Sequence, residues 1–316
     1  MDQGQTRVAV MGAGAVGCYY GGMLALAGIP VTLVGRAQHV EAIARNGLAI
    51  VRDYRRDVVQ VAATTHVAGV AGADVILVCV KSPDTMAAAT AMKTHLRSDA
   101  VVVSLQNGVS NADALLGVVD HVVLAAAVWV GAYMEGPGVV RHTGRGDLIL
   151  GVTRGGAQRL DARARAQAIA KMFESTGVGC PIADDVEQVL WRKLAINCAF
   201  NAVSALGRSR YGRMAGDPAT REIMAAAVRE TVAVARASGI ALDSDEVLDA
   251  VWRTAEALPN QYSSTAQDII RGRPTEIDML NGYVAQRGDG LGMATPVNRT
   301  LHALVRLREA GDDLPG

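Results

Sequence analysis

The sequence predicts an α/β fold in two parts, a doubly wound parallel sheet followed by an all-helical C-terminal domain. Short apolar runs alternate with helical stretches in the first half, and the longest runs are rich in β-branched residues. Beyond Pro181 the strand signals fade and long helical patterns replace them. The 316 residues suit two domains of roughly 100–200 residues each. We therefore expect domains at residues 1–184 and 185–316.

The first half supplies the strands of the predicted sheet. The expected strands are Arg7–Met11, Pro30–Val34, Val58–Ala62, Asp74–Val80, Ala100–Leu105, Val122–Val130 and Asp147–Gly151. The expected helices between them are Ala15–Ala27, Pro83–His95 and Asn111–Leu116. The runs DVILVCV and AVVVSL lack polar alternation, which is typical of strands buried on both faces of a parallel sheet. Strands that alternate with helices imply right-handed βαβ units and an open sheet.

The second half is predicted to be helical throughout. The expected helices are Asp185–Ala205, Pro218–Ser238, Asp243–Ala257, Ser264–Ile270, Glu276–Arg287 and Pro296–Glu309. Few apolar runs of strand length remain between them, so we expect this half to pack as helix on helix.

Composition narrows the function classes. Lys+Arg and Asp+Glu both number 31, and the zero net charge removes the electrostatic reason to expect nucleic acid or an anionic membrane as a partner. The four cysteines lie far apart, which favours reduced thiols in a cytoplasmic protein over a disulfide framework or a metal site. The uncharged stretch Val8–Gly35 could span a bilayer by length, but its glycines and Pro30 favour strand, turn, helix and second strand.

A glycine-rich turn lies between the first expected strand and helix. Gly12, Gly14 and Gly17 match the pattern G-x-G-x-x-G, with Ala15 and Val16 inside the turn. The first glycine allows the tight turn, the second lets the backbone approach a pyrophosphate, and the third lets helix and strand pack closely. The free N–H groups of the helix would bind the phosphate charge. The turn predicts a Rossmann-type dinucleotide site, and a purely structural turn is the alternative.

The residues at the end of the second expected strand indicate which nicotinamide cofactor, NAD or NADP, the protein binds. A carboxylate there would bind the adenine-ribose 2′-hydroxyl of NAD, but the chain has Gly35-Arg36 and no acidic residue before Glu41. The guanidinium of Arg36 can bind a 2′-phosphate instead. We therefore favour NADP over NAD, with an ordinary surface arginine as the alternative.

An apolar segment of the second half carries a polar stripe. Lys193, Asn197 and Asn201 are spaced i, i+4, i+8, so they share one face of a helix whose other residues are almost wholly apolar. Burial of these groups requires polar partners, which a cleft with a polar ligand would supply. Lysine, unlike arginine, can give up its proton in a protein, so Lys193 is a candidate general acid. The alternative is a structural network or an exposed stripe.

Three further segments carry candidate site residues. Lys81 and Asn107 each follow an expected strand, at the edge where open α/β sheets bind ligands. A surface lysine and an Asn-Gly turn are the alternatives. In the polar stretch from Ser263 to Asp278, Pro274 should end one helix, and Glu276 is expected in the first turn of the next, where N–H groups stabilise a carboxylate. By its pattern alone Glu276 indicates only a capped helix.

These residues together resemble a known family, the ketopantoate reductases (2-dehydropantoate 2-reductases). The resemblance covers nearly the whole chain in order: GAGAVG, Lys81, QNGV with Asn107, WRKLAINCAFNAVSAL and SSTAQDIIRGRPTEIDMLNG. The last two motifs are far more specific than the first. The resemblance implies an N-terminal Rossmann domain and a helical C-terminal domain, with the active site between them.

The resemblance also implies roles for the substrate side of the site. Lys193 would protonate the keto oxygen of the substrate as a hydride arrives from NADPH. Asn197 and Asn201 would hydrogen-bond the substrate, and Ser264 would bind its carboxylate. Glu276 would lie beside the nicotinamide ribose and help to orient the lysine.

On the cofactor side, the resemblance places Arg36 at the 2′-phosphate and Lys81 with Asn107 along the nicotinamide, where Asn107 also meets the substrate. Three pocket positions depart from the family: Gln261 and Tyr211 replace asparagines of some members, and Thr265 replaces a common methionine. Taken as a whole, the resemblance leads us to expect an NADPH-dependent reductase that converts ketopantoate to pantoate in pantothenate synthesis. The alternatives are a reductase of another small 2-oxo acid and a noncatalytic NADP-sensing protein, and a homodimer remains open.

Overall fold

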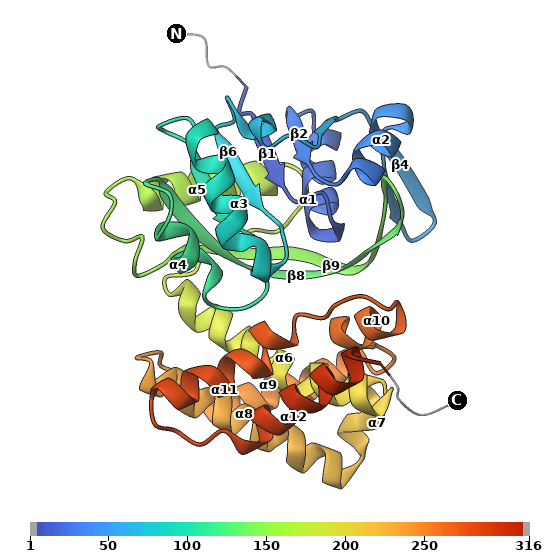
Figure 1. Ribbon diagram of the computed structural model, residues 1–316, viewed down its shortest axis with the longest axis vertical. Helices are drawn as coiled ribbons and strands as arrows, with labels where there is room; N and C mark the ends of the chain where they lie inside the picture. The colour runs from blue at the N-terminus through green and yellow to red at the C-terminus, as the bar shows by residue number, and fades with distance from the viewer. Residues whose placement is uncertain (1–4, 312–316) are drawn as a thin grey trace. The chain divides into compact units, whose positions relative to one another are not determined.

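The computed structural model describes residues 5–311 and divides into two compact units at Val186–Glu187. In the first unit a mixed sheet lies between helices, whereas the described elements of the second unit are all helical (Figure 1). The predicted fold class, a Rossmann-type sheet domain followed by a helical domain, is confirmed.

One sheet runs through the first unit. Its strands are β1 (Val8–Met11), β2 (Val31–Val34), β3 (Leu48–Arg52), β4 (Arg55–Val59), β5 (Ala62–Thr64), β6 (Val75–Val78), β7 (Val101–Ser104), β8 (Val122–Gly136) and β9 (Val139–Val152). The spatial order is β4-β3-β9-β8-β7-β6-β1-β2-β5. The strands from β5 to β8 in this order are parallel, as a doubly wound sheet requires. The antiparallel hairpin β8–β9 then extends the sheet toward β3 and β4.

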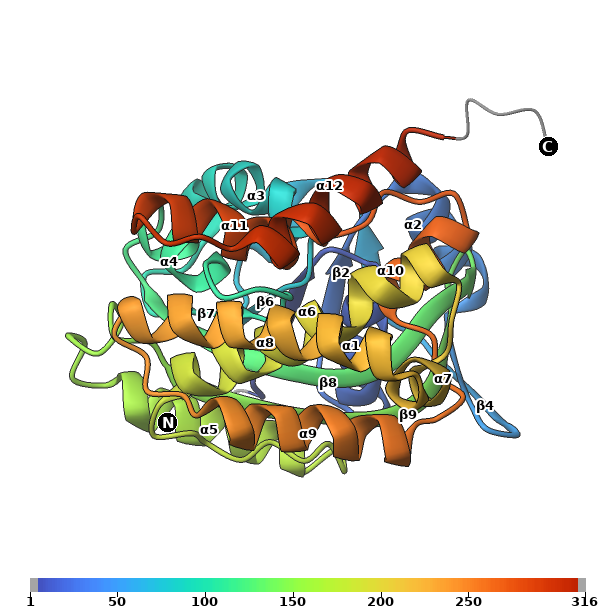
Figure 2. The same ribbon diagram turned by 90° about the horizontal axis from the view of Figure 1, so that it is seen from below.

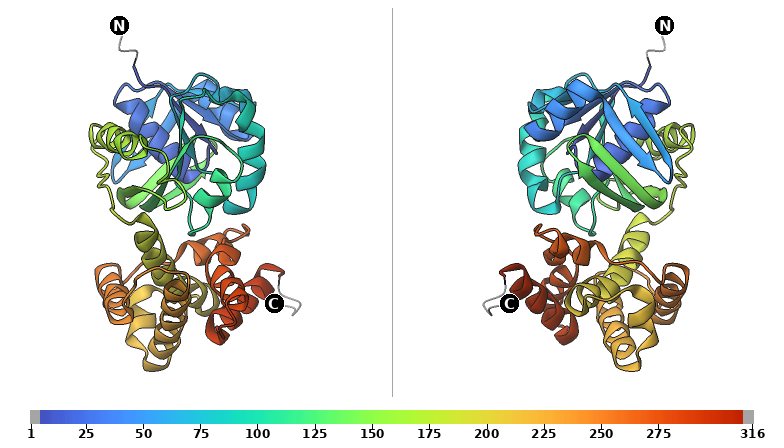
Figure 3. Two further views of the ribbon diagram at one scale, coloured as in Figure 1. Left: turned by 90° about the vertical axis from the view of Figure 1, so that its left-hand side faces the viewer. Right: turned by 90° about the vertical axis from the view of Figure 1, so that its right-hand side faces the viewer.

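Helices cover both faces of the sheet (Figure 3). They are α1 (Ala15–Leu26), α2 (Ala37–Asn46), α3 (Thr85–Met92), α4 (Asn111–Leu116) and α5 (Ala162–Glu174), with 3-10 turns η1 (Val67–Val70), η2 (Ser82–Asp84) and η3 (Lys93–His95). Alternate strand residues such as Val10 and Leu77 join a core with α1 and α5. Their neighbours Ala9 and Ile76 are equally buried on the other face. Burial on both faces explains the unbroken apolar runs of the sequence.

Several elements of this unit differ from the sequence expectation. The single strand expected at Val58–Ala62 is two strands, because β4 forms a hairpin with β3 whereas β5 pairs with β2. Asp53 turns the β3–β4 hairpin with a positive φ of 48°. The helices α2 and α5 and the strand β3 were not anticipated, and neither helix has a side-chain hydrogen bond at its N-cap. Arg36 at the N-cap of α2 gives no sequence signal of a helix start, and Asp161 at the N-cap of α5 makes no capping bond.

The second unit consists of α6 (Val186–Gly207), α7 (Tyr211–Gly216), α8 (Pro218–Ala237), α9 (Ser244–Ala257), α10 (Ser264–Ile270), η4 (Ile277–Met279), α11 (Asn281–Gly290) and α12 (Pro296–Glu309). Helices α11 and α12 lie side by side in Figure 2. Three of these helices begin at a residue whose side chain caps them. The side chains of Asp217, Asp243 and Ser263 accept hydrogen bonds from backbone N–H groups in the first turns of α8, α9 and α10.

A buried hydrogen-bond network ties four of these helices together. Asn281 at the start of α11 donates to the carbonyl of Cys198 in α6 and to Asn298 in α12. The carboxylate of Glu230 in α8 accepts from the backbone N–H groups of Val297 and Asn298 at 2.9 Å each. The network anchors the middle of α6 to its neighbours.

The helix expected over Glu276–Arg287 is wrong in its first turns. A 3-10 turn covers Ile277–Met279, the backbone breaks at Leu280, and α11 begins only at Asn281. The hydrogen bonds of the buried Asn281 amide to two other helices set the start of α11, which local sequence could not reveal.

All four cysteines are free, and burial raises the pKa of Cys18, Cys180 and Cys198 to about 12, so these thiols stay protonated. Among residues 5–311 no helix is long and apolar enough to cross a membrane.

Candidate active site

Four predicted site segments leave the carboxyl ends of four adjacent strands. In the sheet β7, β6, β1 and β2 are neighbours, and their ends lead to Asn107, Lys81, the glycine turn and Arg36. Parallel strands end at one edge, so the structure brings these segments to the same edge of the sheet. The chain leaves β1 between β2 and β6, which lie on its opposite sides. Such a switch point is where open α/β sheets bind ligands.

The glycine turn is built by close backbone contacts. Gly12 has a φ of +116°, and a Cβ there would lie 2.7 Å from the carbonyl carbon of Cys79. A Cβ on Gly17 would lie 2.1 Å from the carbonyl oxygen of Gly12. A Cβ on Gly14 would meet nothing within 4 Å. The first and third glycines are therefore required by the fold itself, whereas space remains open at the second.

This difference predicts different outcomes for two alanine variants. Gly17→Ala should lower the free energy of unfolding by about 1–3 kcal/mol, because the new methyl group meets rigid backbone. Gly14→Ala is the matched control and should change it by less than about 0.5 kcal/mol. Urea unfolding of both variants measures this difference. Equal destabilisation would contradict the roles assigned to the two glycines.

Arg36 and the N-terminus of α1 follow β2 and β1 at this edge of the sheet. Arg36 is the exposed N-cap residue of α2, two residues beyond β2. Across residues 5–311 its guanidinium forms no ion pair or hydrogen bond. The first turn of α1 has no acidic residue and no side-chain cap. The partial positive charge of its free N–H groups is therefore not neutralised by a side chain of this turn. This end of the edge thus presents an exposed guanidinium and helix N–H groups that no side chain caps.

A buried polar network, which the sequence did not reveal, holds the loops after β6 and β7 together. The Ser82 hydroxyl donates to the carbonyl of Asn107 at 3.1 Å, and the amide of Asn111 donates to the same carbonyl at 2.7 Å. Gln106 donates to the carbonyl of Val80 at 3.0 Å and to the hydroxyl of Thr85 at 2.7 Å. The only signal in the sequence was the polar run Gln106-Asn107 after an apolar strand.

In the second unit, α6 is continuous through the predicted polar stripe. Lys193, Asn197 and Asn201 therefore share one helix face, as their spacing predicted. Lys193 and Asn201 are buried, and Asn197 is half-buried.

The start of α10 is hydrogen-bonded to the end of this stripe. Nδ2 of Asn201 donates to the hydroxyls of Ser264 and Thr265, at 3.2 Å and 3.1 Å. Ser263 caps α10 and also donates to the backbone carbonyl of Asn201. The structure thus brings together Asn201 and Ser264, which are 63 residues apart.

Two of the positions that depart from the family, Tyr211 and Gln261, lie near this contact. The N–H of Tyr211 donates to the carbonyl of Gln261 at 3.0 Å, and the Tyr211 ring stacks on Phe200 of α6 at 4.0 Å between centroids. The amide of Gln261 donates to the carbonyl of Tyr262. Tyr211 and Gln261 thus fix the segment that leads into α10.

Glu276 lies in a turn whose flanking residues are hydrogen-bonded to side chains of α12. Its predicted place in a first helical turn is wrong, since it precedes the short η4 with φ −105° and ψ 23°. The carboxylate of Glu309 accepts the N–H of Thr275 at 2.6 Å, and His302 contacts Asp278 at 2.6 Å. Side chains of α12 therefore set the position of the Glu276 backbone.

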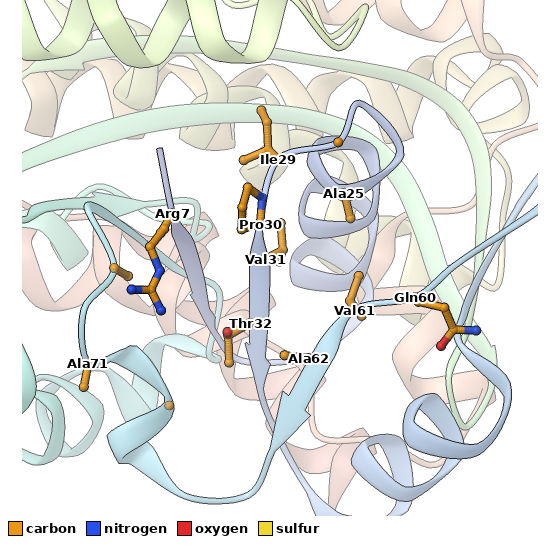
Figure 4. Close-up of a pocket in the computed structure, with 13 residues that line it drawn as sticks. Arg7, Ala25, Ile29, Pro30, Val31, Thr32, Gln60, Val61, Ala62 and Ala71 are labelled. Atoms are coloured by element: carbon orange, nitrogen blue, oxygen red, sulfur yellow. The ribbon is translucent and has the colours of Figure 1, made fainter. Parts of the chain in front are cut away.

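A pocket of about 420 Å³ lies at the opposite edge of the sheet (Figure 4). It is lined by residues before the starts of β1, β2 and β5, among them Arg7, Pro30 and Val61. None of the predicted site residues lines it. Within residues 5–311 no cluster of three or more His, Cys, Asp or Glu residues is placed to hold a metal ion.

Comparison with known proteins identifies the class to which this chain belongs. Residues 8–155 match the family described as ketopantoate reductase PanE/ApbA, and residues 185–309 match its C-terminal domain. The 2-dehydropantoate 2-reductase of Halobacterium salinarum is 35% identical over 309 residues, which cover 96% of this chain and 99% of that one. The fold and these relatives define an oxidoreductase.

Solved structures agree with this class. A PanE/ApbA family ketopantoate reductase from Ralstonia eutropha is 48% identical with a TM-score of 0.88, over 96% of this chain and 99% of that one. A D-mandelate dehydrogenase solved with NADH and anilino(oxo)acetate is 26% identical with a TM-score of 0.89, over the same shares. The chain belongs to the ketopantoate reductase family, which confirms the resemblance found in the sequence.

Proposed function

We propose that this protein reduces ketopantoate to pantoate with NADPH, with Lys193 as the proton donor, as a step of pantothenate synthesis. The observation that carries the proposal is the shared face of α6: an ammonium and two amides lie in a row, and the last amide is bonded to Ser264. Such groups match the carbonyl, carboxylate and hydroxyl of a small polar 2-oxo acid. The names of the relatives support the same substrate.

The first unit supports a dinucleotide with a 2′-phosphate. The tight backbone contacts at Gly12 and Gly17, with open space at Gly14, suit a pyrophosphate beside Ala15 and Val16 at the start of α1. An exposed arginine, rather than a carboxylate, follows β2. Arg36 would therefore bind the 2′-phosphate of NADP, and Lys81 and Asn107 would line the nicotinamide side.

The chemistry assigned to the side chains follows from charge. When bound, NADPH supplies the hydride that C2 of the substrate receives. The Lys193 ammonium stabilises the negative charge that develops on the C2 oxygen and donates a proton to it. Asn197 and Asn201 hold the substrate in one orientation, and Ser264 hydrogen-bonds its carboxylate. The Glu276 carboxylate attracts and orients the ammonium group.

A second candidate is a reductase of another small 2-oxo acid. The likeness to a D-mandelate dehydrogenase favours it, since that protein was solved with a 2-oxo acid analogue that carries an aromatic ring. Gln261 and Tyr211, which replace asparagines of some family members, also lie beside the proposed pocket.

A substrate panel distinguishes the candidates. Purified protein with NADPH should reduce ketopantoate with a kcat/KM at least roughly 10-fold above that for phenylglyoxylate, because an aromatic acid leaves polar pocket groups unpaired. Loss of nicotinamide absorbance measures the rate. A preference for phenylglyoxylate would replace the substrate assignment. Tight NADPH binding without turnover of any 2-oxo acid would indicate a noncatalytic NADP sensor.

A further inference from the structure

The amide of Asn201 has both of its protons engaged by hydroxyl groups of α10. Nδ2 carries two N–H donors, and it contacts the oxygens of Ser264 and Thr265 at 3.2 Å and 3.1 Å. Asn201 and Thr265 are 3% and 2% exposed, so this contact is formed inside the second unit. Every side-chain hydrogen bond that Asn201 makes within residues 5–311 runs through Nδ2.

With both protons engaged, the amide offers a ligand only its oxygen. Oδ1 is an acceptor with two lone pairs. A substrate carboxylate and a substrate keto oxygen are also acceptors, so neither can pair with Oδ1. Of the polar groups in a small 2-oxo acid, only a hydroxyl on the alkyl arm can donate to it. The orientation of this amide therefore selects for a hydroxylated substrate.

We propose that Thr265 is a specificity-determining positioning residue, which orients the Asn201 amide so that the site prefers 2-oxo acids with an alkyl hydroxyl. The inference rests on the proposed function and deepens it. Ser264 alone leaves one amide proton free, because its hydroxyl is a single partner and is exposed. Thr265 supplies the second, buried partner. A hydrocarbon side chain at this position would let the amide rotate and offer N–H or oxygen alike.

A pair of acids that differ in one group tests this role. Ketopantoate and 3,3-dimethyl-2-oxobutanoate differ only in the hydroxyl on the alkyl arm. We expect the wild-type protein to favour ketopantoate, measured as the ratio of the two kcat/KM values with NADPH. Thr265→Val has almost the same shape but lacks the hydroxyl, and it should lower this ratio roughly 3–10-fold, the worth of one hydrogen bond. The loss should fall on ketopantoate, while the analogue keeps its rate.

Two control variants separate orientation of the amide from general damage. Thr265→Ser restores a hydroxyl and should return the ratio to near the wild-type value. Thr231→Val removes a buried threonine hydroxyl from α8, where it donates to the carbonyl of Ala227, and should leave the ratio unchanged. Melting curves of all variants verify that each one folds.

The outcomes distinguish the inference from the function on which it rests. A ratio in Thr265→Val equal to the wild-type ratio, with both acids reduced, overturns the role of Thr265 and leaves the reductase assignment standing. An equal fall of both rates, which Thr265→Ser does not reverse, also overturns it. Reduction of neither acid by the wild-type protein overturns the proposed function and this inference together.

Discussion

Lys193→Ala is expected to lower kcat by roughly 10²–10⁴-fold while the affinity for NADPH stays nearly unchanged. The variant removes both the proton donor and the positive charge at the oxygen that becomes negative. Lys193 belongs to the α6 face, whereas the proposed nucleotide contacts, apart from Glu276 at the nicotinamide ribose, come from the first unit, so the loss should be confined to turnover. Steady-state kinetics and titration of NADPH measure the two effects separately.

Two companion variants refine this result. Lys193→Arg keeps a positive charge but cannot give up a proton, so its kcat should also remain low. Lys171→Ala, at an exposed position of α5, should retain the wild-type rate. An unimpaired Lys193→Ala would mean that the proton comes from another group. Full activity of Lys193→Arg would mean that charge alone is sufficient.

Arg36→Ala should weaken NADPH binding roughly 10–100-fold and leave NADH binding almost unchanged. A charge-assisted hydrogen bond contributes about 1.5–3 kcal/mol, and only NADPH carries the 2′-phosphate that would accept it. The position of Arg36 beyond β2, without a partner among residues 5–311, leaves its guanidinium available for this contact. Dissociation constants for both cofactors measure the difference.

Arg45→Ala provides the matched control, since Arg45 is exposed at the other end of α2 and donates to the carbonyl of Glu41. It should leave the affinity for both cofactors unchanged. Equal losses of NADPH and NADH affinity in Arg36→Ala would contradict the assignment to the 2′-phosphate.

Features that depend on neighbouring residues were predictable from the sequence. The strand, glycine turn and helix from Val8 to Leu26 appear where the pattern placed them, because turn geometry and apolar periodicity are local properties. The shared face of Lys193, Asn197 and Asn201 follows from helix periodicity alone. These features account for much of the candidate site.

Features that depend on tertiary hydrogen bonds were not predictable. The break before α11 comes from the bonds of Asn281 to Cys198 and Asn298, which are far away in the sequence. The contact of Asn201 with Thr265 likewise joins two helices, and no spacing rule indicates it. The family resemblance marked Thr265 as unusual, but only the structure shows the group that it contacts.

The proton transfer from Lys193 is the central claim, and a crystal structure with NADP⁺ and pantoate tests it most directly. The distance between Nζ of Lys193 and the C2 hydroxyl oxygen of pantoate is the quantity to measure. We predict a hydrogen bond of about 2.7–3.2 Å. A separation well beyond hydrogen-bond range, with another proton donor beside that oxygen, would contradict the mechanism.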